Sequence, residues 1–241
     1  PISVMLLDDK WRGMDENNEL LNYTFNKQLF SNPGEFINNL HQKGIRVGVN
    51  INPELDITKN EEMYNEAIKY IQPDKDGKIK FAPLNPRFID VYFKLFIAKL
   101  ESYGVDFFWN DYSNLSDLKS LWIMNHYFYL DLSKNISKRG MLMSRNPLVA
   151  SHKYSVLYSG KTKVSWENFK KLPFFNISSA NIGVTWWSHD ICGYSGGVEE
   201  DDLYIRSVQL GVFSPILRFH SKAGKYYKKE PWKWNYKTEY L

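Results

Sequence analysis

Cysteine is almost absent from the sequence, with Cys192 as the single example in 241 residues. One cysteine excludes an internal disulfide and is compatible with a reducing compartment, although many secreted bacterial proteins also lack disulfides. Long apolar runs are missing as well, and no signal-like segment opens the chain, which begins at Pro1. We therefore predict no membrane partner, leave the localisation open, and expect the chain to be an excerpt of a longer protein with flanking domains.

A large excess of either charge is lacking too, because 31 basic residues face 27 acidic ones for a net charge of +4. The lysines are scattered except in residues 222–233, so a nucleic-acid partner is not favoured. The sequence also lacks the Cys-x-x-Cys and His-Glu-x-x-His patterns of metal sites and the glycine-rich turn of nucleotide-binding folds. These absences argue against metal hydrolysis and phosphoryl transfer, and we predict no cofactor.

Aromatic residues are abundant, with 16 Tyr, 15 Phe and 8 Trp. They fit either a large core or a sugar-binding cleft, because the faces of pyranose rings pack on aromatic rings. Composition does not separate these two interpretations. The length suits one α/β domain with a substantial core, and residues 1–241 are predicted to form a single, partial barrel domain.

Short apolar runs alternate along the chain with segments of helical periodicity. Strands are predicted at residues 2–7, 45–51, 105–109, 141–144, 155–158, 184–187 and 216–218. Helices are predicted at residues 34–44, 61–71, 88–103, 118–137, 166–180 and 199–213. Residues 22–33 are predicted to be a loop, and the polar, lysine-rich residues 57–86 are predicted to contain an insertion. The alternation indicates a parallel α/β architecture.

Polar side chains follow nearly every predicted strand. The apolar run at residues 105–109 leads to Asp111, a candidate nucleophile or base, although an aspartate can also cap a turn. The other residues in this kind of position are Asp8, Arg145, Lys161, Asp190 and His220. Because the carboxyl ends of barrel strands form the active site, the pattern predicts a (β/α)8 TIM barrel whose first strand lies upstream of Pro1. A doubly wound sheet is the alternative, although it would call for a phosphate-binding turn.

The chemistry of this set favours glycoside cleavage, which uses paired carboxylates. A cation held by Asp8, Asp190 and His220 is a second interpretation, but the clustered histidines usual in metal sites are missing. We therefore predict no metal site.

The stretch Trp109-Asn110-Asp111 resembles the nucleophile motif of glycoside hydrolase family 31, the retaining α-glucosidase and α-xylosidase group. Further matches follow in order along nearly the whole chain: Leu7-Asp8, Tyr23-Thr24-Phe25-Asn26, Ser144-Arg145, Tyr158-Ser159-Gly160 with Trp166, His189-Asp190-Ile191-Cys192-Gly193, and Gln209-Leu210-Gly211 with residues 215–220. This resemblance implies hydrolysis of an α-linked oligosaccharide or glycoside, with Asp111 as the nucleophile. It also implies a cleavage subsite whose sugar hydroxyls are held by Asp8, Arg145, Asp190 and His220, and which is lined by Trp109, Trp187 and Tyr194.

Two positions depart from the family pattern. Asn114 stands where a glutamate is common, and Lys161 stands where the family has the aspartate that acts as general acid/base. A retaining glycosidase needs a group that first protonates the leaving oxygen and then deprotonates water. An ammonium group is a weak acid and no base, so Lys161 implies slow turnover of ordinary glycosides.

Three hypotheses follow from these residues. The first is the catalytic domain of a retaining α-glycosidase. The second is a family 31-like domain that binds α-glycans with weak or no hydrolysis, because of Lys161. The third is a structural or interaction module without a sugar site, which would show no quenching of its tryptophan fluorescence by sugars. The sequence does not choose among glucose, galactose, xylose and substituted sugars.

Overall fold

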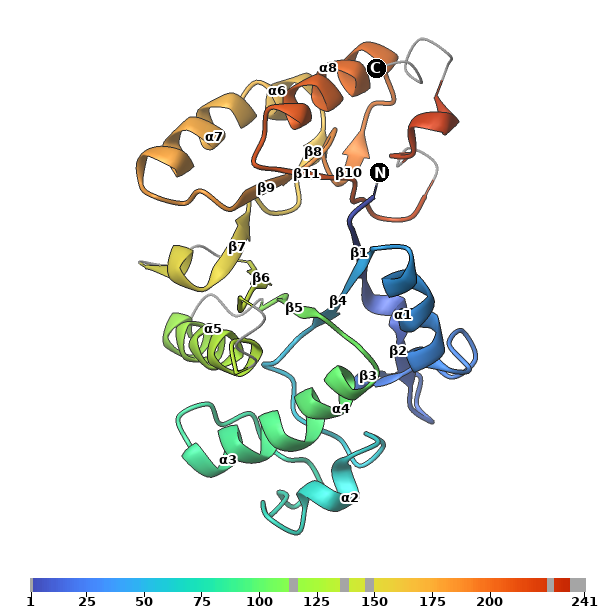
Figure 1. Cartoon of the computed structure of the whole chain (residues 1–241), viewed down its shortest axis with the longest axis vertical. Coiled ribbons are helices and arrows are strands. Elements are labelled where there is room, and N and C mark those ends of the chain that lie inside the picture. Colours follow the sequence, from blue (N-terminus) through green and yellow to red (C-terminus); the bar gives the residue numbers. More distant parts are fainter. Residues whose placement is uncertain (1, 113–116, 135–138, 146–149, 225–227, 235–241) are drawn as a thin grey trace. The chain divides into compact units, whose positions relative to one another are not determined.

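The computed structural model describes residues 2–112, 117–134, 139–145, 150–224 and 228–234. The chain divides into two compact units, Pro1–Ser144 and Arg145–Leu241, and each is described by itself. In Figure 1 the first unit runs from blue through green and the second from yellow to red. Asn114 lies outside the described residues.

Four parallel strands form the main sheet of the first unit: β1 (Val4–Leu7), β4 (Arg46–Ile51), β5 (Phe107–Asn110) and β6 (Leu142–Ser144). Ile51 pairs with Asn110, which pairs with Ser144, so the last three strands end at the same level. Leu7 pairs with Val49, so β1 ends two residues earlier along this edge. All four strands were predicted to within two residues.

Helices lie along one side of this sheet (Figure 1): α1 (Pro33–Gln42), α4 (Ala98–Ser102) and α5 (Leu118–Leu132). The α1 helix begins after Asn32, whose side chain accepts a hydrogen bond from the amide of Glu35. Gly44 follows its end with a φ of 75°, a conformation that glycine adopts without strain. The α5 helix was predicted to extend to residue 137, but residues 135–138 lie outside the described part of the chain.

The helix predicted at residues 88–103 is confirmed as one helical run. It consists of α3 (Pro86–Val91), a π-helical stretch η2 (Tyr92–Ile97) and α4. Its apolar stripe is buried, with Phe88, Tyr92 and Phe96 almost fully covered. Burial of this stripe against the sheet stabilises the helical run more than its intrinsic propensity does.

An antiparallel hairpin follows the short 3-10 helix η1 (Asp9–Trp11) and pairs β2 (Arg12–Met14) with β3 (Leu20–Phe25). The predicted loop at residues 22–33 is therefore wrong for its first four residues. Polar side chains hid the strand in the sequence, because Asn22 is buried within β3 and Thr24 donates a hydrogen bond to the buried Glu61 at 2.7 Å.

The predicted insertion at residues 57–86 contains one short helix, α2 (Tyr64–Ala67). The longer helix predicted at residues 61–71 is thus mostly wrong. Hydrogen-bonded turns continue the chain from α2 to Ile71, and the segment then turns back so that Ile57 and Ile79 exchange backbone hydrogen bonds of 2.9 and 3.0 Å. Ile57, Ala67 and Ile79 are buried, so this segment is packed onto the unit.

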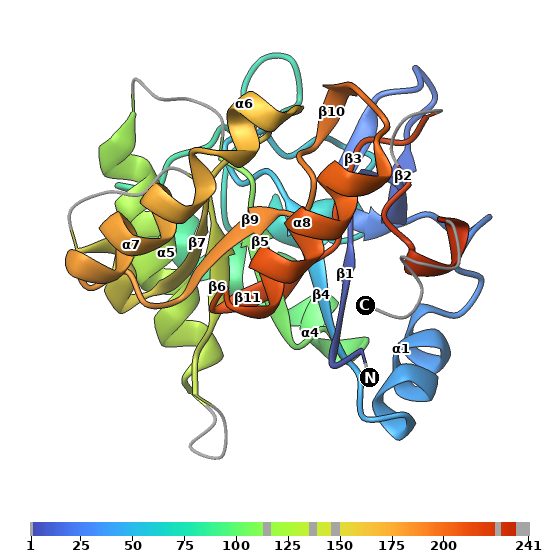
Figure 2. The same cartoon turned by 90° about the horizontal axis from the view of Figure 1, so that it is seen from above.

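The second unit has three parallel strands, β7 (Ser155–Tyr158), β9 (Trp187–Asp190) and β11 (Ile216–Arg218), with β9 in the middle. Its helices are α6 (Trp166–Phe169), α7 (Leu172–Asn181) and α8 (Asp201–Val212). Figure 2 shows α7 beside β9 and α8 beside β11. The predicted helix at residues 166–180 is broken before Pro173, as expected for a proline in the first turn of a new helix.

The strand predicted at residues 184–187 is displaced by three residues in the structure, where β9 runs from Trp187 to Asp190. Hydrophobicity did not reveal it, because Ser188, His189 and Asp190 are polar and yet almost fully buried. Asp190 is consequently the last residue of its strand.

Further short elements complete the second unit. They are the parallel pair β8 (Lys163–Val164) and β10 (Ser195–Gly197), and the 3-10 helices η3 (Ser151–Lys153) and η4 (Pro231–Lys233). The β8–β10 pair was not predicted, and it joins the segment after β7 to the segment after β9. Among the described residues, no helix is both long and apolar enough to span a bilayer.

Candidate active site

Two predicted acids follow strands that flank β4 in the first unit. Asp8 comes directly after β1, and its side chain accepts a hydrogen bond of 2.9 Å from the amide of Asp9. Asp111 comes directly after β5, and its amide donates to the carbonyl of Ile51 at the end of β4, at 3.0 Å. Because the carboxyl ends of parallel strands meet at one edge of a sheet, the structure brings both aspartates to the same edge of this unit.

The face of β5 that carries Trp109 follows from the alternation of side chains along the strand. Phe108 packs on Phe128 of α5, with ring centroids 5.4 Å apart, and Asn110 bonds to Asn125 of the same helix. Trp109 therefore points to the face of the sheet away from α5, where it is completely buried. Asp111 lies two residues further on, so continued alternation would direct it to the same face as Trp109.

A buried polar bridge supports the ends of β5 and β6 and was missed in the sequence. Asn110 Nδ2 donates to Asn125 Oδ1 at 3.0 Å, and Asn125 Nδ2 donates to Ser144 Oγ at 3.0 Å. All three residues are almost fully buried. Asn125 thus ties together the two strand ends that precede Asp111 and Arg145. Its only signal in the sequence is an asparagine on the apolar side of a predicted helix.

A second buried polar group supports the end of β4. Asn22 accepts the amide of Asn52 at 2.9 Å and donates to the carbonyl of Asn52 at 2.6 Å. The Glu61 carboxylate accepts the amides of Asn22 and Tyr23, and burial raises the pKa of Glu61 above its ordinary value. This network fixes the chain just after β4, between the segments that carry Asp8 and Asp111.

In the second unit, Asp190 at the end of β9 forms an ion pair with Arg218 at the end of β11. Arg218 Nη2 lies 2.6 Å from Asp190 Oδ1, and Arg218 Nε donates to Ser188 Oγ at 3.1 Å. The guanidinium also lies 5.0 Å from the centre of the Tyr158 ring. The sequence analysis did not select Arg218, although its place two residues before His220 at the end of a strand was a signal.

Three more predicted residues gather in loops of the same unit. The Lys161 ammonium lies 5.0 Å from the centre of the Tyr194 ring, and the rings of Tyr194 and His220 are 5.2 Å apart. Backbone hydrogen bonds hold the three loops together, because the amide of Tyr194 donates to Thr162 at 2.7 Å and the amide of Lys222 donates to Tyr194 at 3.1 Å. The structure therefore brings Lys161, Tyr194 and His220 together.

Two histidines of this unit, His189 and His220, are held neutral by their surroundings. Burial, together with the positive charges of Arg218, Lys161 and Lys229, lowers the pKa of His220 to about 3. Burial also lowers the pKa of His189 to about 4, and His189 Nε2 lies 2.7 Å from Ser214 Oγ. At neutral pH a neutral imidazole at position 220 can both donate and accept hydrogen bonds, as a sugar hydroxyl requires.

Trp187 does not join this group of residues. It is the first residue of β9, buried with Leu157 and Val184, and its indole donates to Asn176 of α7 at 2.9 Å. Because side chains alternate along a strand, Trp187 and His189 face the helices, whereas Ser188 and Asp190 face Arg218. The structure therefore does not bring Trp187 together with Lys161, Tyr194 and His220, and its role in a sugar subsite stays a prediction. Arg145 directly follows β6 and is half-buried.

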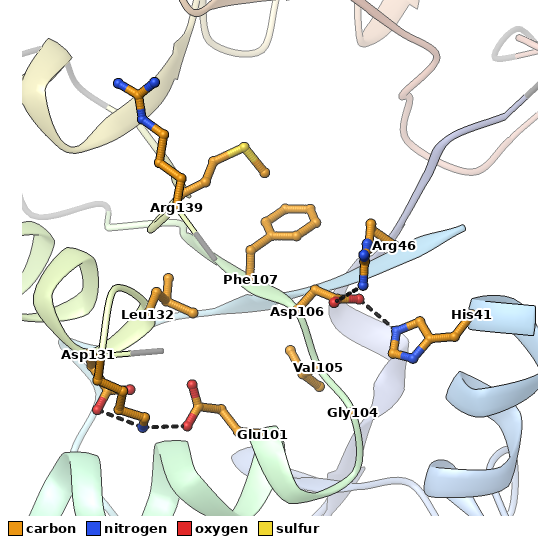
Figure 3. A pocket seen from close by; sticks show the side chains of 12 residues that line it. His41, Arg46, Glu101, Gly104, Val105, Asp106, Phe107, Asp131, Leu132 and Arg139 are labelled. Carbon is orange, nitrogen blue, oxygen red and sulfur yellow. Dashed lines mark hydrogen bonds and ion pairs between the residues drawn. The ribbon is translucent and has the colours of Figure 1, made fainter. Parts of the chain in front are cut away.

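A cavity of about 580 Å³ lies near the opposite, amino-terminal ends of β4 and β5. Figure 3 shows His41 and Arg46 directed at Asp106, with distances of 2.7 and 3.1 Å to its carboxylate oxygens. Lys134 bridges Glu101 and Asp131 at 2.7 and 3.0 Å. In these two clusters each acid shown has a cationic partner, so the cavity offers no carboxylate pair of the kind that cleaves glycosides.

Metal ligation finds no support among the described residues, since nowhere in them do three His, Cys, Asp or Glu side chains gather closely enough to hold an ion. Asp190 is instead engaged with Arg218. Cys192 is buried, and burial raises the pKa of its thiol, which makes it a poor nucleophile.

Comparison with known protein families gives one match over the whole chain. The family described as "Glycosyl hydrolases family 31 TIM-barrel domain" matches residues 1–241. Among curated proteins, alpha-glucosidase 2 of Bacillus thermoamyloliquefaciens is 23% identical over 278 residues, covering 99% of this chain and 34% of that protein. The 1,3-alpha-isomaltosidase of Kribbella flavida is 27% identical over 92 residues, covering 38% of this chain and 13% of that protein. The matched regions thus amount to about a third or less of these relatives.

Solved structures share the fold at low sequence identity. An alpha-xylosidase of the same family from a soil metagenome, solved with xylose, has a TM-score of 0.69 at 19% identity and covers 92% of this chain and 37% of that chain. The cycloalternan-degrading enzyme of Trueperella pyogenes, solved with a covalent intermediate, has a TM-score of 0.70 at 18% identity. This match covers 97% of the present chain and 39% of that enzyme's chain.

Proposed function

The chain belongs to glycoside hydrolase family 31 as a TIM-barrel domain of that family, and from this premise we propose that it hydrolyses α-glycosidic bonds by a retaining double-displacement mechanism. The observation that carries the proposal is the position of Asp111, directly after β5 and at the same sheet edge as Asp8. Catalytic residues of barrel enzymes occupy this position. The family match supports a carbohydrate-directed domain over the third hypothesis, a module without a sugar site, and quenching of tryptophan fluorescence by sugars tests that choice.

In this proposal Asp111 is the nucleophile. Its carboxylate attacks the anomeric carbon, the bond to the leaving oxygen breaks, and a covalent glycosyl-enzyme forms that water then hydrolyses. One structural neighbour, the Trueperella pyogenes enzyme, was solved with a covalent intermediate, which supports a double displacement on this fold. Trp109, on the face to which continued alternation directs Asp111, would shield the reacting sugar from water.

Substrate binding in the second unit would rest on Asp190, Tyr194 and His220. The ion pair with Arg218 holds the Asp190 carboxylate in a fixed orientation. The neutral imidazole of His220 can donate or accept a hydrogen bond, and the Tyr194 ring offers an apolar face. Asp8 and Arg145 would contribute the remaining polar contacts, and the partner is an α-linked oligosaccharide or glycoside.

Lys161 favours a second candidate function, an α-glycan-binding domain that hydrolyses weakly. Its ammonium lies 5.0 Å from the centre of the Tyr194 ring and its charge acts on His220. The sequence resemblance implies that Lys161 stands where the family has its acid/base aspartate. A charged ammonium cannot deprotonate the attacking water. Because general acid/base catalysis contributes roughly a hundred- to ten-thousand-fold, we expect slow turnover of glycosides with poor leaving groups.

Covalent trapping tests the assignment of Asp111. A fluorinated α-glycoside with a good leaving group is incubated with the protein, and the labelled peptide is identified by mass spectrometry. The proposal expects the label on Asp111 and no label in the Asp111→Asn variant. A label on a different carboxylate would overturn the assignment.

Replacement of Lys161 by aspartate separates the two candidate functions. If the lysine limits the acid/base step, Lys161→Asp raises kcat on unactivated glycosides by about a hundredfold or more, with little change for substrates that need no protonation. Lys163→Asp, two residues away on β8, is the matched control and leaves that rate unchanged. Rapid turnover of unactivated glycosides by the wild-type protein would instead mean that a different group supplies the proton.

A further inference from the structure

The turn after β9 has an unusual backbone conformation. Cys192 and Gly193 are consecutive left-handed residues, with φ angles of 60° and 75°, and the amide of Gly193 donates to the carbonyl of Asp190 at 2.9 Å. A left-handed conformation is unfavourable at a residue other than glycine, so neighbouring contacts must hold Cys192 in place. This turn joins Asp190 to Tyr194, the two residues proposed to hold the sugar.

Lys229 supplies that contact from a distant part of the sequence. Its ammonium donates to the carbonyl of Ile191 and to the carbonyl of Gly193, both at 2.7 Å, on either side of Cys192. Lys229 is only 6% exposed, which is rare for a lysine. Two buried carbonyl groups thus depend on one buried cation for their hydrogen bonds.

The backbone of Lys229 is itself anchored. Tyr204 of α8 donates its hydroxyl to the carbonyl of Lys229 at 2.6 Å, and the Tyr204 ring stacks on Trp234 with a centroid distance of 4.2 Å. The turn after β9 is therefore connected through Lys229 to the rigid helix α8.

We propose that Lys229 is a positioning residue, whose bonds to the Ile191 and Gly193 carbonyls hold the turn that fixes Asp190 and Tyr194 in the sugar-binding subsite. The inference rests on the proposed function, because it concerns the residues assigned to that subsite. A lysine that only fastened residues 228–234 to the unit would affect stability and leave the subsite unchanged. The two roles therefore differ in their effect on substrate binding.

The experiment compares Lys229→Met with Lys233→Met in the full-length protein. Lys233 belongs to the same segment, but its side chain is about half exposed and pairs with Glu230 at 2.6 Å. Rates are measured with an activated α-glycoside and divided by the concentration of active sites, titrated with the fluoroglycoside. This division removes the effect of unfolded protein on the rates. KM does not depend on the fraction of protein that is unfolded.

For Lys229→Met we expect KM to rise and kcat/KM per active site to fall by about a hundredfold, as for a displacement of roughly 1 Å at a reacting centre. Lys229→Arg, which can still donate to both carbonyls, restores part of this loss, and Lys233→Met keeps wild-type values. Wild-type KM and kcat in a folded Lys229→Met variant would overturn the inference.

Tyr204→Phe decides the question if Lys229→Met does not fold, because it removes only the hydroxyl that anchors Lys229. A rise in KM of about threefold or more supports the positioning role, and an unchanged KM overturns it. Failure of the proposed function looks different, since the wild-type protein itself would then show neither labelling nor turnover.

Discussion

Replacement of Asn125 by leucine tests whether the buried polar bridge supports the candidate site. Leucine has the same branched skeleton of heavy atoms as asparagine, so the change removes the hydrogen bonds without leaving a large cavity. Asn110 and Ser144 lose the partners that they contact at 3.0 Å on β5 and β6. A buried polar group left without a partner costs about 1–3 kcal/mol, and Asn110 Nδ2 is the group whose bond to Asn125 is removed.

We therefore expect Asn125→Leu to lower the free energy of unfolding by about 1–3 kcal/mol. Urea denaturation followed by tryptophan fluorescence measures this change, because the fully buried Trp109 lies beside Asn110. Asn39→Leu in α1 is the matched control, since Asn39 is exposed on a helix of the same unit. The control should change stability by no more than about 0.5 kcal/mol.

Activity gives a second measurement of the same variant. The bridge fixes the strand ends that precede Asp111 and Arg145, so folded Asn125→Leu should also lose kcat with the activated glycoside. Equal stability of the two leucine variants would refute the account of a buried bridge. A loss of stability with unchanged kcat would refute its role in placing Asp111.

Two further predictions concern the second unit. Arg218→Leu removes the cation that pairs with the buried carboxylate of Asp190. The free energy of unfolding, measured by urea denaturation, should therefore fall by about 3–5 kcal/mol. A loss below about 1 kcal/mol would contradict a stabilising role of the ion pair. Burial lowers the pKa of His189 to about 4 and that of His220 to about 3, below the ordinary value of about 6.5. Stability from these neutral imidazoles is complete above pH ~6.5. It is lost as the pH falls toward the pKa values of the two histidines in the folded state, because the unfolded chain then binds protons that the folded chain does not. Denaturation midpoints should therefore drop over this pH range, and His189→Gln should make the drop smaller. An NMR titration in which either imidazole is protonated near its ordinary pKa would refute the claim that burial lowers the pKa values of His189 and His220.

The positions of the acids could be predicted because strand ends are marked in the sequence. Apolar runs before Asp8 and Asp111 gave β1 and β5 to within two residues, and parallel strands bring their carboxyl ends to one edge. The family resemblance, drawn from the ordered motifs, is confirmed by the match over residues 1–241. The upstream first strand and the roles of the individual residues stay predictions.

Where strands are built from polar residues, hydrophobic patterns failed. β9 is formed by Trp187, Ser188, His189 and Asp190, whose burial depends on partners elsewhere in the chain. The period-2 alternation along β9 places Trp187 on the helix side, together with His189.

The sequence by itself determined the order of strands and helices and the acid that follows β5, because backbone periodicity and local burial are encoded over short segments. Only the tertiary structure decided that Arg218 neutralises Asp190, that Asn125 joins two strand ends, and that Lys229 holds the turn after β9. These pairs are 19 to 38 residues apart in the chain. Hydrogen bonds and ion pairs of this kind are set by the three-dimensional packing, which no local pattern of residues specifies.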